Sequence, residues 1–192
     1  MKTFSPKKRW GFLKRILWLI FLVALVATSG LFCYQIQRGN FHVVKEDKVY
    51  RSGQLTALQL EEYVGAYGIR SVLNLRGKNE SADWWQEEVS VCRNLGLYHY
   101  DLPLSSKREP TQEEIIQLLN ILREAPKPLL IHCEGGADRT GFASALYLYF
   151  FEDYPYQKAK RQLSFLYGHA PFFRRWTRSM DTALERFCLT YQ

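Results

Sequence analysis

The stretch that most restricts how this chain can fold is residues 128–151, where two apolar runs flank a glycine-containing loop. The first run, PLLIHC (128–133), is too apolar for an edge strand and predicts a central strand in a parallel sheet. The second run, GFASALYLYFF (141–151), predicts a buried helix. A strand that leads directly into a helix is the repeating unit of α/β domains.

Other segments alternate in the same way along most of the chain. Strands are predicted at 48–54, 69–77 and 98–104, and helices at 55–68, 82–96, 112–124, 156–168 and 171–189. Thr111 and Glu114 form a capping box at the start of the helix at 112–124. We therefore expect an α/β domain with a mostly parallel central sheet of four to five strands flanked by helices.

Charge is distributed unevenly along the chain, whose formal net charge is +7. Residues 1–40 hold seven Lys and Arg and no acidic residue, whereas residues 41–192 hold 19 basic and 19 acidic residues. Because the body of the chain is formally neutral, its high isoelectric point is not the footprint of a nucleic-acid-binding surface. We predict no nucleic-acid partner.

An uncharged run at residues 16–34 predicts one transmembrane helix before the domain. As a helix it spans about 28 Å, close to the ~30 Å hydrocarbon core of a bilayer. Trp10, Trp18 and Tyr34 lie near its ends, where interfacial aromatic residues are expected. A cleaved signal peptide is the alternative, but its apolar region is typically ~7–15 residues, so the longer run favours an uncleaved anchor.

These features divide the chain into four predicted segments. They are a basic cytoplasmic tail (1–15), a transmembrane anchor (16–34), a polar connector (35–47) and a folded domain (48–192). Six basic residues precede the anchor, and the positive-inside rule places that side in the cytoplasm. The folded domain is then extracytoplasmic, on the periplasmic side in a bacterial cell.

The loop HCEGGADRTG (132–141) combines groups that suit an anion site. Gly135 and Gly136 let the backbone curl so that several N–H groups converge on a tetrahedral oxyanion. The start of the next helix favours an anion as well. Arg139 adds a planar fork for two phosphate oxygens, and in this setting Cys133 is expected to react as a thiolate.

A thiolate that faces a bound phosphoryl group predicts phosphoryl transfer to sulfur, followed by hydrolysis. Thr140 is placed to hydrogen-bond the sulfur and ease its departure in the second step, while His132 orients the loop. The predicted phosphate-binding residues are Glu134, Gly135, Gly136, Ala137, Asp138 and Arg139.

The pattern His-Cys-(five residues)-Arg-Thr-Gly after an apolar strand resembles the signature of cysteine-dependent protein tyrosine phosphatases. KVYRSGQL, GIRSVLNLRG and HCEGGADRTG, in that order, look like the compact atypical dual-specificity branch, and the looser resemblance covers residues 45–190. It implies the phosphatase fold, Cys133 as the nucleophile that forms a cysteinyl-phosphate, Arg139 as the phosphate clamp and Thr140 as its helper. It implies no metal and no other cofactor.

Two other readings of the loop stay open. A catalytically inactive relative would bind phosphorylated ligands without turning them over. A sulfurtransferase also surrounds a thiolate with backbone amides, but its loop lacks the Arg-Thr-Gly exit found here at residues 139–141.

The general acid, which protonates the leaving group and is often worth ~10²–10⁴-fold in rate, has three candidates. In the family this acid lies on a separate loop about thirty residues before the cysteine, and Asp101 fits that spacing although it lies in a predicted strand. Asp138 is the second candidate, because a loop aspartate is thought to supply this proton in the myotubularin lipid phosphatases. Glu109, in the polar loop after that strand, is the third, and the remaining alternative is that none of the three is the acid.

The sequence leaves the substrate open among three classes. The loop contains no lysine, and Glu134 argues against densely phosphorylated inositols. A phosphorylated membrane lipid suits an anchored domain. Phosphotyrosine or another phosphoprotein and soluble phosphate esters are the other two classes.

Overall fold

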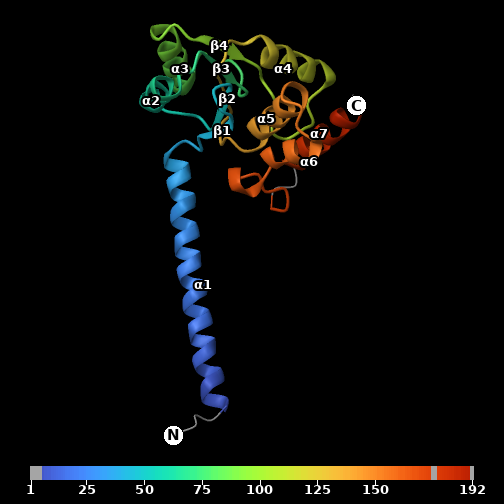
Figure 1. Cartoon of the computed structure of the whole chain (residues 1–192). Helices are drawn as coiled ribbons and strands as arrows, with labels where there is room; N and C mark the ends of the chain where they lie inside the picture. Colours follow the sequence, from blue (N-terminus) through green and yellow to red (C-terminus); the bar gives the residue numbers. More distant parts are fainter. Residues whose placement is uncertain (1–5, 174–176, 191–192) are drawn as a thin grey trace. The chain divides into compact units, whose positions relative to one another are not determined.

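The computed structural model describes residues 6–173 and 177–190 (Figure 1). The chain divides into two compact units, residues 1–38 and 39–192. Residues 1–5 of the predicted basic tail lie outside the described residues.

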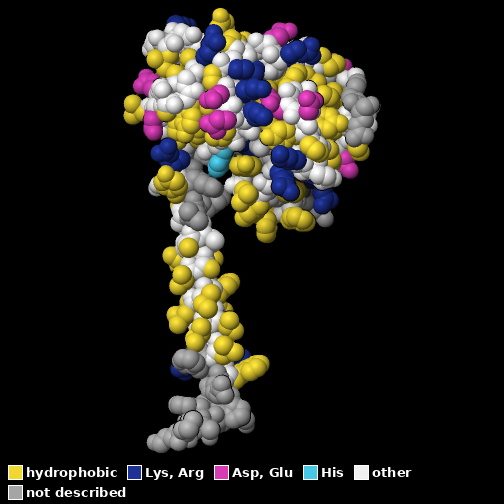
Figure 2. All heavy atoms as spheres, viewed as in Figure 1, with side chains coloured by type: hydrophobic (Ala, Val, Ile, Leu, Met, Phe, Trp, Pro, Cys, Tyr) yellow, Lys and Arg dark blue, Asp and Glu magenta, His cyan; other side chains and the backbone are white. Residues whose placement is uncertain are grey.

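Helix α1 (Pro6–Gln37) contains the whole of the predicted apolar run. Within it, the 18-residue window Leu13–Gly30 is long and apolar enough to cross a membrane, and none of this window is buried. Hydrophobic side chains cover the visible sides of this part of the helix (Figure 2). Length and composition alone are weak evidence of a transmembrane helix, because a signal sequence passes the same test.

A five-stranded sheet forms the centre of the second unit, in the order β1-β2-β5-β3-β4. Its strands are β1 (His42–Lys45), β2 (Val49–Ser52), β3 (Ser71–Asn74), β4 (Tyr98–Asp101) and β5 (Leu129–His132). β1 is antiparallel to β2, and the other neighbours are parallel. The prediction of a mostly parallel sheet with a central strand near residue 130 is confirmed.

The structure differs from the sequence analysis in the segment that we interpreted as a connector, residues 35–47. α1 continues to Gln37, and β1 joins the sheet through pairs such as His42 with Arg51. A strand of four residues is too short for its alternation of apolar and polar side chains to be recognised within a polar sequence. The strand is defined by its pairing with β2.

Four helices follow their predictions closely. They are α2 (Ala57–Tyr67), α3 (Asp83–Asn94), α4 (Gln112–Glu124) and α5 (Asp138–Phe151). Thr111 and Glu114 form the predicted capping box at the start of α4. α2 ends at Gly68, which adopts the left-handed conformation expected of a helix-ending glycine.

The two predicted C-terminal helices are shorter than the sequence indicated. The segment predicted as 156–168 consists of α6 (Tyr156–Ala159) and the 3₁₀ turns η1 (Lys160–Gln162) and η2 (Phe165–Tyr167). Leu163, with φ −97° and ψ 77°, leaves the helical region, and the carbonyl and side chain of Gln162 beside it accept hydrogen bonds from Arg51. α7 (Arg178–Thr190) begins seven positions later than residue 171, where we predicted its start, and residues 174–176 lie outside the described residues.

Two hydrophobic cores fill the space between the sheet and its helices, which cover both faces (Figure 1). On one face, side chains of α4, α5 and α7 pack against β3 and β5; on the other, side chains of α2 and α3 do so. All members of both clusters lie between residues 41 and 188. Residues 39–192 therefore contain complete cores, and we expect this unit to fold without α1.

Candidate active site

The predicted loop connects the central strand β5 to α5, at the carboxyl ends of the parallel strands. This edge of an open α/β sheet is where such folds bind ligands. Cys133 is the first residue after β5, and its side chain is 3% exposed. Cys133, Cys92 and Cys188 all belong to the hydrophobic core clusters, and burial raises the pKa of the Cys92 and Cys188 thiols to about 12.

Gly136 allows the loop to pack directly against the end of β2. Its φ of +69° lies in the left-handed region, and a Cβ atom there would lie 2.5 Å from Gly53 N and 2.7 Å from Ser52 O. Gly53 is constrained less tightly, since its Cβ would lie 3.0 Å from the carbonyl oxygen of Glu134. Side chains at these positions would separate the loop from β2, so glycine is required for this contact.

Four successive loop carbonyls accept hydrogen bonds from outside the loop. They belong to Glu134, Gly135, Gly136 and Ala137. Gln54 N donates to the first (2.9 Å), Asn40 Nδ2 to the second (2.9 Å), and Arg51 Nη2 to the third (2.7 Å) and fourth (3.3 Å). In the described part of the chain, no backbone carbonyl accepts from the N–H groups of these four residues. With the carbonyls bonded outward, the N–H groups are left for an anion.

Arg139 lies in the first turn of α5, and its guanidinium is held by two backbone carbonyls. Its Nη1 atom donates to Leu75 O and Leu104 O, both at 3.3 Å, on the loops after β3 and β4. Its Nε atom is buried and has no hydrogen-bond partner among the described residues. The edge of the guanidinium that carries Nε and Nη2 is therefore the one that can bind a ligand in bidentate fashion.

Thr140 is fully buried beside the loop, and its hydroxyl donates to Ser52 O at 3.4 Å. This bond is a further link between the start of α5 and the end of β2. The predicted contact of Thr140 with the sulfur of Cys133 stays a prediction.

Glu88 on α3 is a buried carboxylate that the sequence analysis missed. His132 Nε2 lies 3.1 Å and His99 Nε2 2.8 Å from it, and Gln54 Nε2 donates to it at 2.7 Å. Burial opposes the charge on Glu88, yet the two imidazoles lower its pKa to about 2. The carboxylate thus fixes the side chain of the residue before Cys133. The sequence does contain a signal for it. Glu88 precedes Val91 by three residues and Cys92 by four, which places it on the buried face of α3.

Asp101 is the last residue of β4, so it lies at the carboxyl ends of the parallel strands, as the loop does. Its carboxylate accepts from Asn74 Nδ2 at 2.7 Å and from Trp85 Nε1 at 3.1 Å, and His99 Nδ1 lies 3.7 Å away. β3 separates β4 from β5 in the sheet. Asp101 therefore belongs to the set of side chains around this edge, two strands away from Cys133.

Asp138 turns toward a buried histidine. Its Oδ1 atom lies 2.6 Å from His169 Nδ1, and the other ring nitrogen lies 2.8 Å from Asp181 Oδ2 on α7. Burial disfavours a charged imidazole, but the hydrogen bonds to these two carboxylates raise the pKa of His169 to about 9. An imidazolium therefore offsets the negative charge that Asp138 brings to the anion loop.

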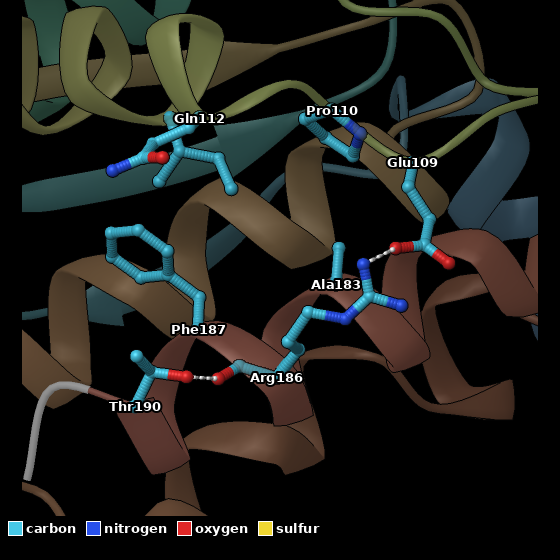
Figure 3. Close-up of a pocket in the computed structure, with 8 residues that line it drawn as sticks. Glu109, Pro110, Gln112, Ala183, Arg186, Phe187 and Thr190 are labelled. Carbon is cyan, nitrogen blue, oxygen red and sulfur yellow. Dashed lines mark hydrogen bonds and ion pairs between the residues drawn. The ribbon is translucent and has the colours of Figure 1, made fainter.

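Glu109 lies in a different environment from the other two candidate acids. Its Oε2 atom lies 3.0 Å from Arg186 Nη1 on α7, and both residues line a pocket of about 260 Å³ between α7 and the start of α4 (Figure 3). No residue of the loop 132–141 lines this pocket.

Arg76 brings a second guanidinium to the strand ends near the loop. Its Cζ atom lies 3.6 Å from the ring centroid of Trp84, and its Nη1 atom donates to Gln54 Oε1 at 2.9 Å. The backbone N–H of Gln54 donates to Glu134 O, so Arg76 is linked to the loop through Gln54 alone.

Together, the sheet order and the outward-bonded loop define an α/β protein with a candidate oxyanion site at the end of its central strand. The sequence model of the tyrosine phosphatase family matches residues 33–152, which is more than half of the chain. The chain therefore belongs to the tyrosine phosphatase family. None of the curated proteins compared with the chain matches it.

Solved structures show the same fold at low sequence identity. TpbA of P. aeruginosa is 20% identical, with a TM-score of 0.58, over 79% of this chain and 89% of TpbA. The core catalytic domain of the S. cerevisiae PP-IP phosphatase Siw14, in complex with citrate, is 22% identical, with a TM-score of 0.56, over 79% of this chain and 92% of that domain. A cysteine-to-serine variant of TpbA in complex with phosphotyrosine is 19% identical, with a TM-score of 0.56, over 79% of this chain and 90% of the variant.

Proposed function

We propose that the protein is a phosphoric monoester hydrolase of the dual-specificity and tyrosine phosphatase type, with Cys133 as its nucleophile. Membership of the tyrosine phosphatase family supports the hydrolysis of phosphate esters. The observation that carries the assignment is the loop after β5, whose four successive carbonyls bond outward beside a thiol and an arginine. A loop of this kind directs its N–H groups at a tetrahedral oxyanion.

In the proposed first step, the loop N–H groups and the Nε–Nη2 edge of Arg139 bind the phosphate oxygens. The Cys133 thiolate attacks phosphorus, the S–P bond forms, and the P–O bond to the leaving group breaks. The electron pair of that bond goes to the departing oxygen, which takes a proton from the general acid. The arginine fork and the N–H groups stabilise the charge on the equatorial oxygens throughout.

In the proposed second step, a water molecule attacks phosphorus and the S–P bond breaks. Inorganic phosphate leaves, and the thiolate of Cys133 is restored for the next turnover. Thr140 is proposed to hydrogen-bond the sulfur as it departs. The same residue that donated the first proton accepts a proton from the water.

We propose Asp101 as the general acid, with Asp138 second and Glu109 third. Asp101 ends a strand at the sheet edge that carries Cys133. Asp138 Oδ1 lies 2.6 Å from His169 Nδ1, so its carboxylate is turned toward the histidine. Glu109 pairs with Arg186 at a pocket that the loop does not line.

For the substrate we propose a phosphorylated membrane lipid or phosphotyrosine. The bound phosphotyrosine in the TpbA variant and the PP-IP phosphatase activity named for Siw14 show that fold relatives take phosphorylated compounds of unlike kinds. In this chain the absence of lysine from the loop and the exposed Glu134 disfavour the most densely charged inositol substrates. A membrane anchor at residues 16–34 would bring lipid phosphates within reach.

The proposed domain order keeps the tail (1–15) and the anchor (16–34), shortens the connector to 35–41, and begins the phosphatase domain at β1 (His42–Lys45). The apolar composition of Leu13–Gly30 supports the anchor. A protein that lacks turnover and binds phosphorylated ligands remains the alternative function.

The experiment uses the fragment 39–192 with p-nitrophenyl phosphate and a metal chelator. We expect turnover by the unsubstituted fragment and none by Cys133→Ser, because a hydroxyl is a far weaker nucleophile than a thiolate. Cys133→Ser should still bind tungstate, a tetrahedral oxyanion, because the loop donors are intact. Cys92→Ala is the matched control, since it removes a buried thiol from the other side of the fold and should keep turnover.

Full activity in Cys133→Ser would refute covalent catalysis through this residue. Tungstate binding by an unsubstituted fragment that hydrolyses none of several aryl, lipid and peptide phosphates would support the binding-module alternative.

A further inference from the structure

Arg51 is a buried arginine whose contacts go to uncharged acceptors. Its side chain on β2 is 0% exposed, and the described part of the chain contains no salt bridge to it. Nη1 donates to the carbonyl oxygen of Gln162 at 2.8 Å and to its Oε1 at 2.6 Å. Nη2 donates to Gly136 O at 2.7 Å and to Ala137 O at 3.3 Å, and Ala137 O also accepts from Gly141 N at 2.9 Å.

A charged guanidinium without a carboxylate partner is costly to bury. Burial lowers the pKa of Arg51 to about 10, which still leaves it charged at neutral pH. The ring of Tyr167, whose centroid lies 4.0 Å from Cζ, covers the face of the guanidinium. The fold therefore holds an uncompensated positive charge in its interior, against the anion loop.

The sheet register places this charge on the same side of the sheet as Cys133. Arg51 pairs with Ile131 in the parallel ladder between β2 and β5, and alternate residues of a strand share a face. Cys133 follows Ile131 by two positions. The side chain of Arg51 then reaches past the end of β5 to the carbonyls at the far end of the loop, next to α5.

We propose that Arg51 is a positioning residue for the oxyanion: it holds the Gly136 and Ala137 carbonyls away from the bound anion and provides a fixed positive charge behind the loop. This inference rests on the proposed function, in which that loop binds the phosphoryl group. Its geometric basis is that one guanidinium serves two successive loop carbonyls. If either carbonyl turned inward, it would place a negative dipole where the phosphate oxygens bind.

A role in bracing the strands does not account for these contacts. β2 is already fixed by ladders to β1 and β5, and none of the four acceptors of Arg51 lies on a strand. They lie on the anion loop and on η1, which follows α6. The contacts thus connect the loop to a segment that the strand pairing does not hold.

The test measures tungstate binding by calorimetry to fragment 39–192 and to its variants, together with their thermal midpoints. Arg51→Met keeps the length of the side chain but removes all donors, so we expect a dissociation constant raised at least about tenfold. Arg51→Lys keeps a buried cation without the planar fork and should rescue part of the loss, giving an increase of about three- to tenfold.

Leu118→Ala is the matched control for loss of stability alone. Leu118 is fully buried on α4, and the substitution should lower the thermal midpoint while leaving the dissociation constant for tungstate unchanged. An Arg51→Met protein that is destabilised but binds tungstate as the unsubstituted fragment does would overturn the inference. If Arg51→Met does not fold, an unchanged dissociation constant in Arg51→Lys overturns it equally.

The outcomes separate this inference from the proposed function. Tungstate binding that depends on Arg51, in a fragment that hydrolyses no phosphate ester, would reject the proposed function and keep the inference. Hydrolysis by a fragment whose tungstate affinity does not depend on Arg51 would reject the inference and keep the proposed function. A fragment that binds no tungstate would reject both.

Discussion

At the scale of single residues, the three candidate acids differ in the partners of their carboxylates. Asp101 accepts from two neutral donors, Asn74 and Trp85, and His99 Nδ1 lies 3.7 Å away. Asp138 and Glu109 each pair with a side chain that is charged at neutral pH, His169 and Arg186. The geometry thus ranks Asp101 first, because its carboxylate is tied to neither His169 nor Arg186.

Leaving-group chemistry distinguishes these acids. p-Nitrophenol departs with little protonation, whereas an alkyl alcohol needs a proton, so loss of the true acid slows alkyl phosphates much more than aryl phosphates. We expect Asp101→Asn to lower kcat/KM for an alkyl phosphate by about 10²-fold more than for p-nitrophenyl phosphate. The measurement is the ratio of the two kcat/KM values in the 39–192 fragment.

Asp138→Asn and Glu109→Gln serve as the comparison variants for that ratio. An aryl-to-alkyl ratio that stays constant in Asp101→Asn and rises in Asp138→Asn would move the acid into the anion loop. Equal losses on both substrates in Asp101→Asn would indicate a structural role for Asp101.

At the scale of elements, His169 ties the start of α5 to α7. It bonds Asp138 at the first position of α5 and Asp181 in the first turn of α7. Because its pKa rises from an ordinary 6.5 to about 9 on folding, the folded state binds this proton more tightly than the unfolded state. The stabilisation is complete below pH 6.5 and is lost as the pH rises through 9.

We therefore expect the free energy of unfolding of the 39–192 fragment to fall between pH 6.5 and pH 9 by up to about 3 kcal/mol. The measurement is urea unfolding at a series of pH values. His169→Gln should flatten this part of the profile, because glutamine has no proton to lose. A slope that is the same in His169→Gln would assign the pH dependence to other groups.

The same elements show which parts of the structure the sequence could predict. The capping box of α4 and the strand–loop–helix around Cys133 depend on neighbours within a few residues, and both are confirmed as elements. The predicted helix after residue 156 is broken at Leu163, and Gln162 beside it bonds Arg51, 111 residues away. No local pattern contains such a contact.

The candidate site divides in the same way. Its thiol, glycines and arginine lie within one stretch of ten residues, so a spacing pattern identifies them. The donors that orient the loop carbonyls come from Asn40, Arg51 and Gln54, and the buried acid behind His132 comes from α3. These residues carry no common spacing, and only the sheet order brings them together.

At the scale of the whole molecule, the chain joins two units of opposite character. The 39–192 unit contains both hydrophobic cores, whereas the Leu13–Gly30 window of α1 is apolar and has no buried residue. An apolar helix of this length gains most when its side chains leave water for a bilayer. The basic residues before residue 16, with no acid in the first forty, predict the orientation.

We expect residues 7–15 in the cytoplasm and residue 192 on the other side of the membrane. Alkaline phosphatase fused after Gln192 should be active in a bacterial host, because that enzyme matures only outside the cytoplasm, and green fluorescent protein exported at the same position should be dark. The fragment 39–192 with the same fusions is the control and should give the reverse pattern. If the full chain also gives the reverse pattern, the orientation is wrong.

An active alkaline phosphatase fusion that is released from washed membranes and shortened at its N-terminus would show instead that α1 is a cleaved signal sequence, since an anchor of this length stays in the bilayer.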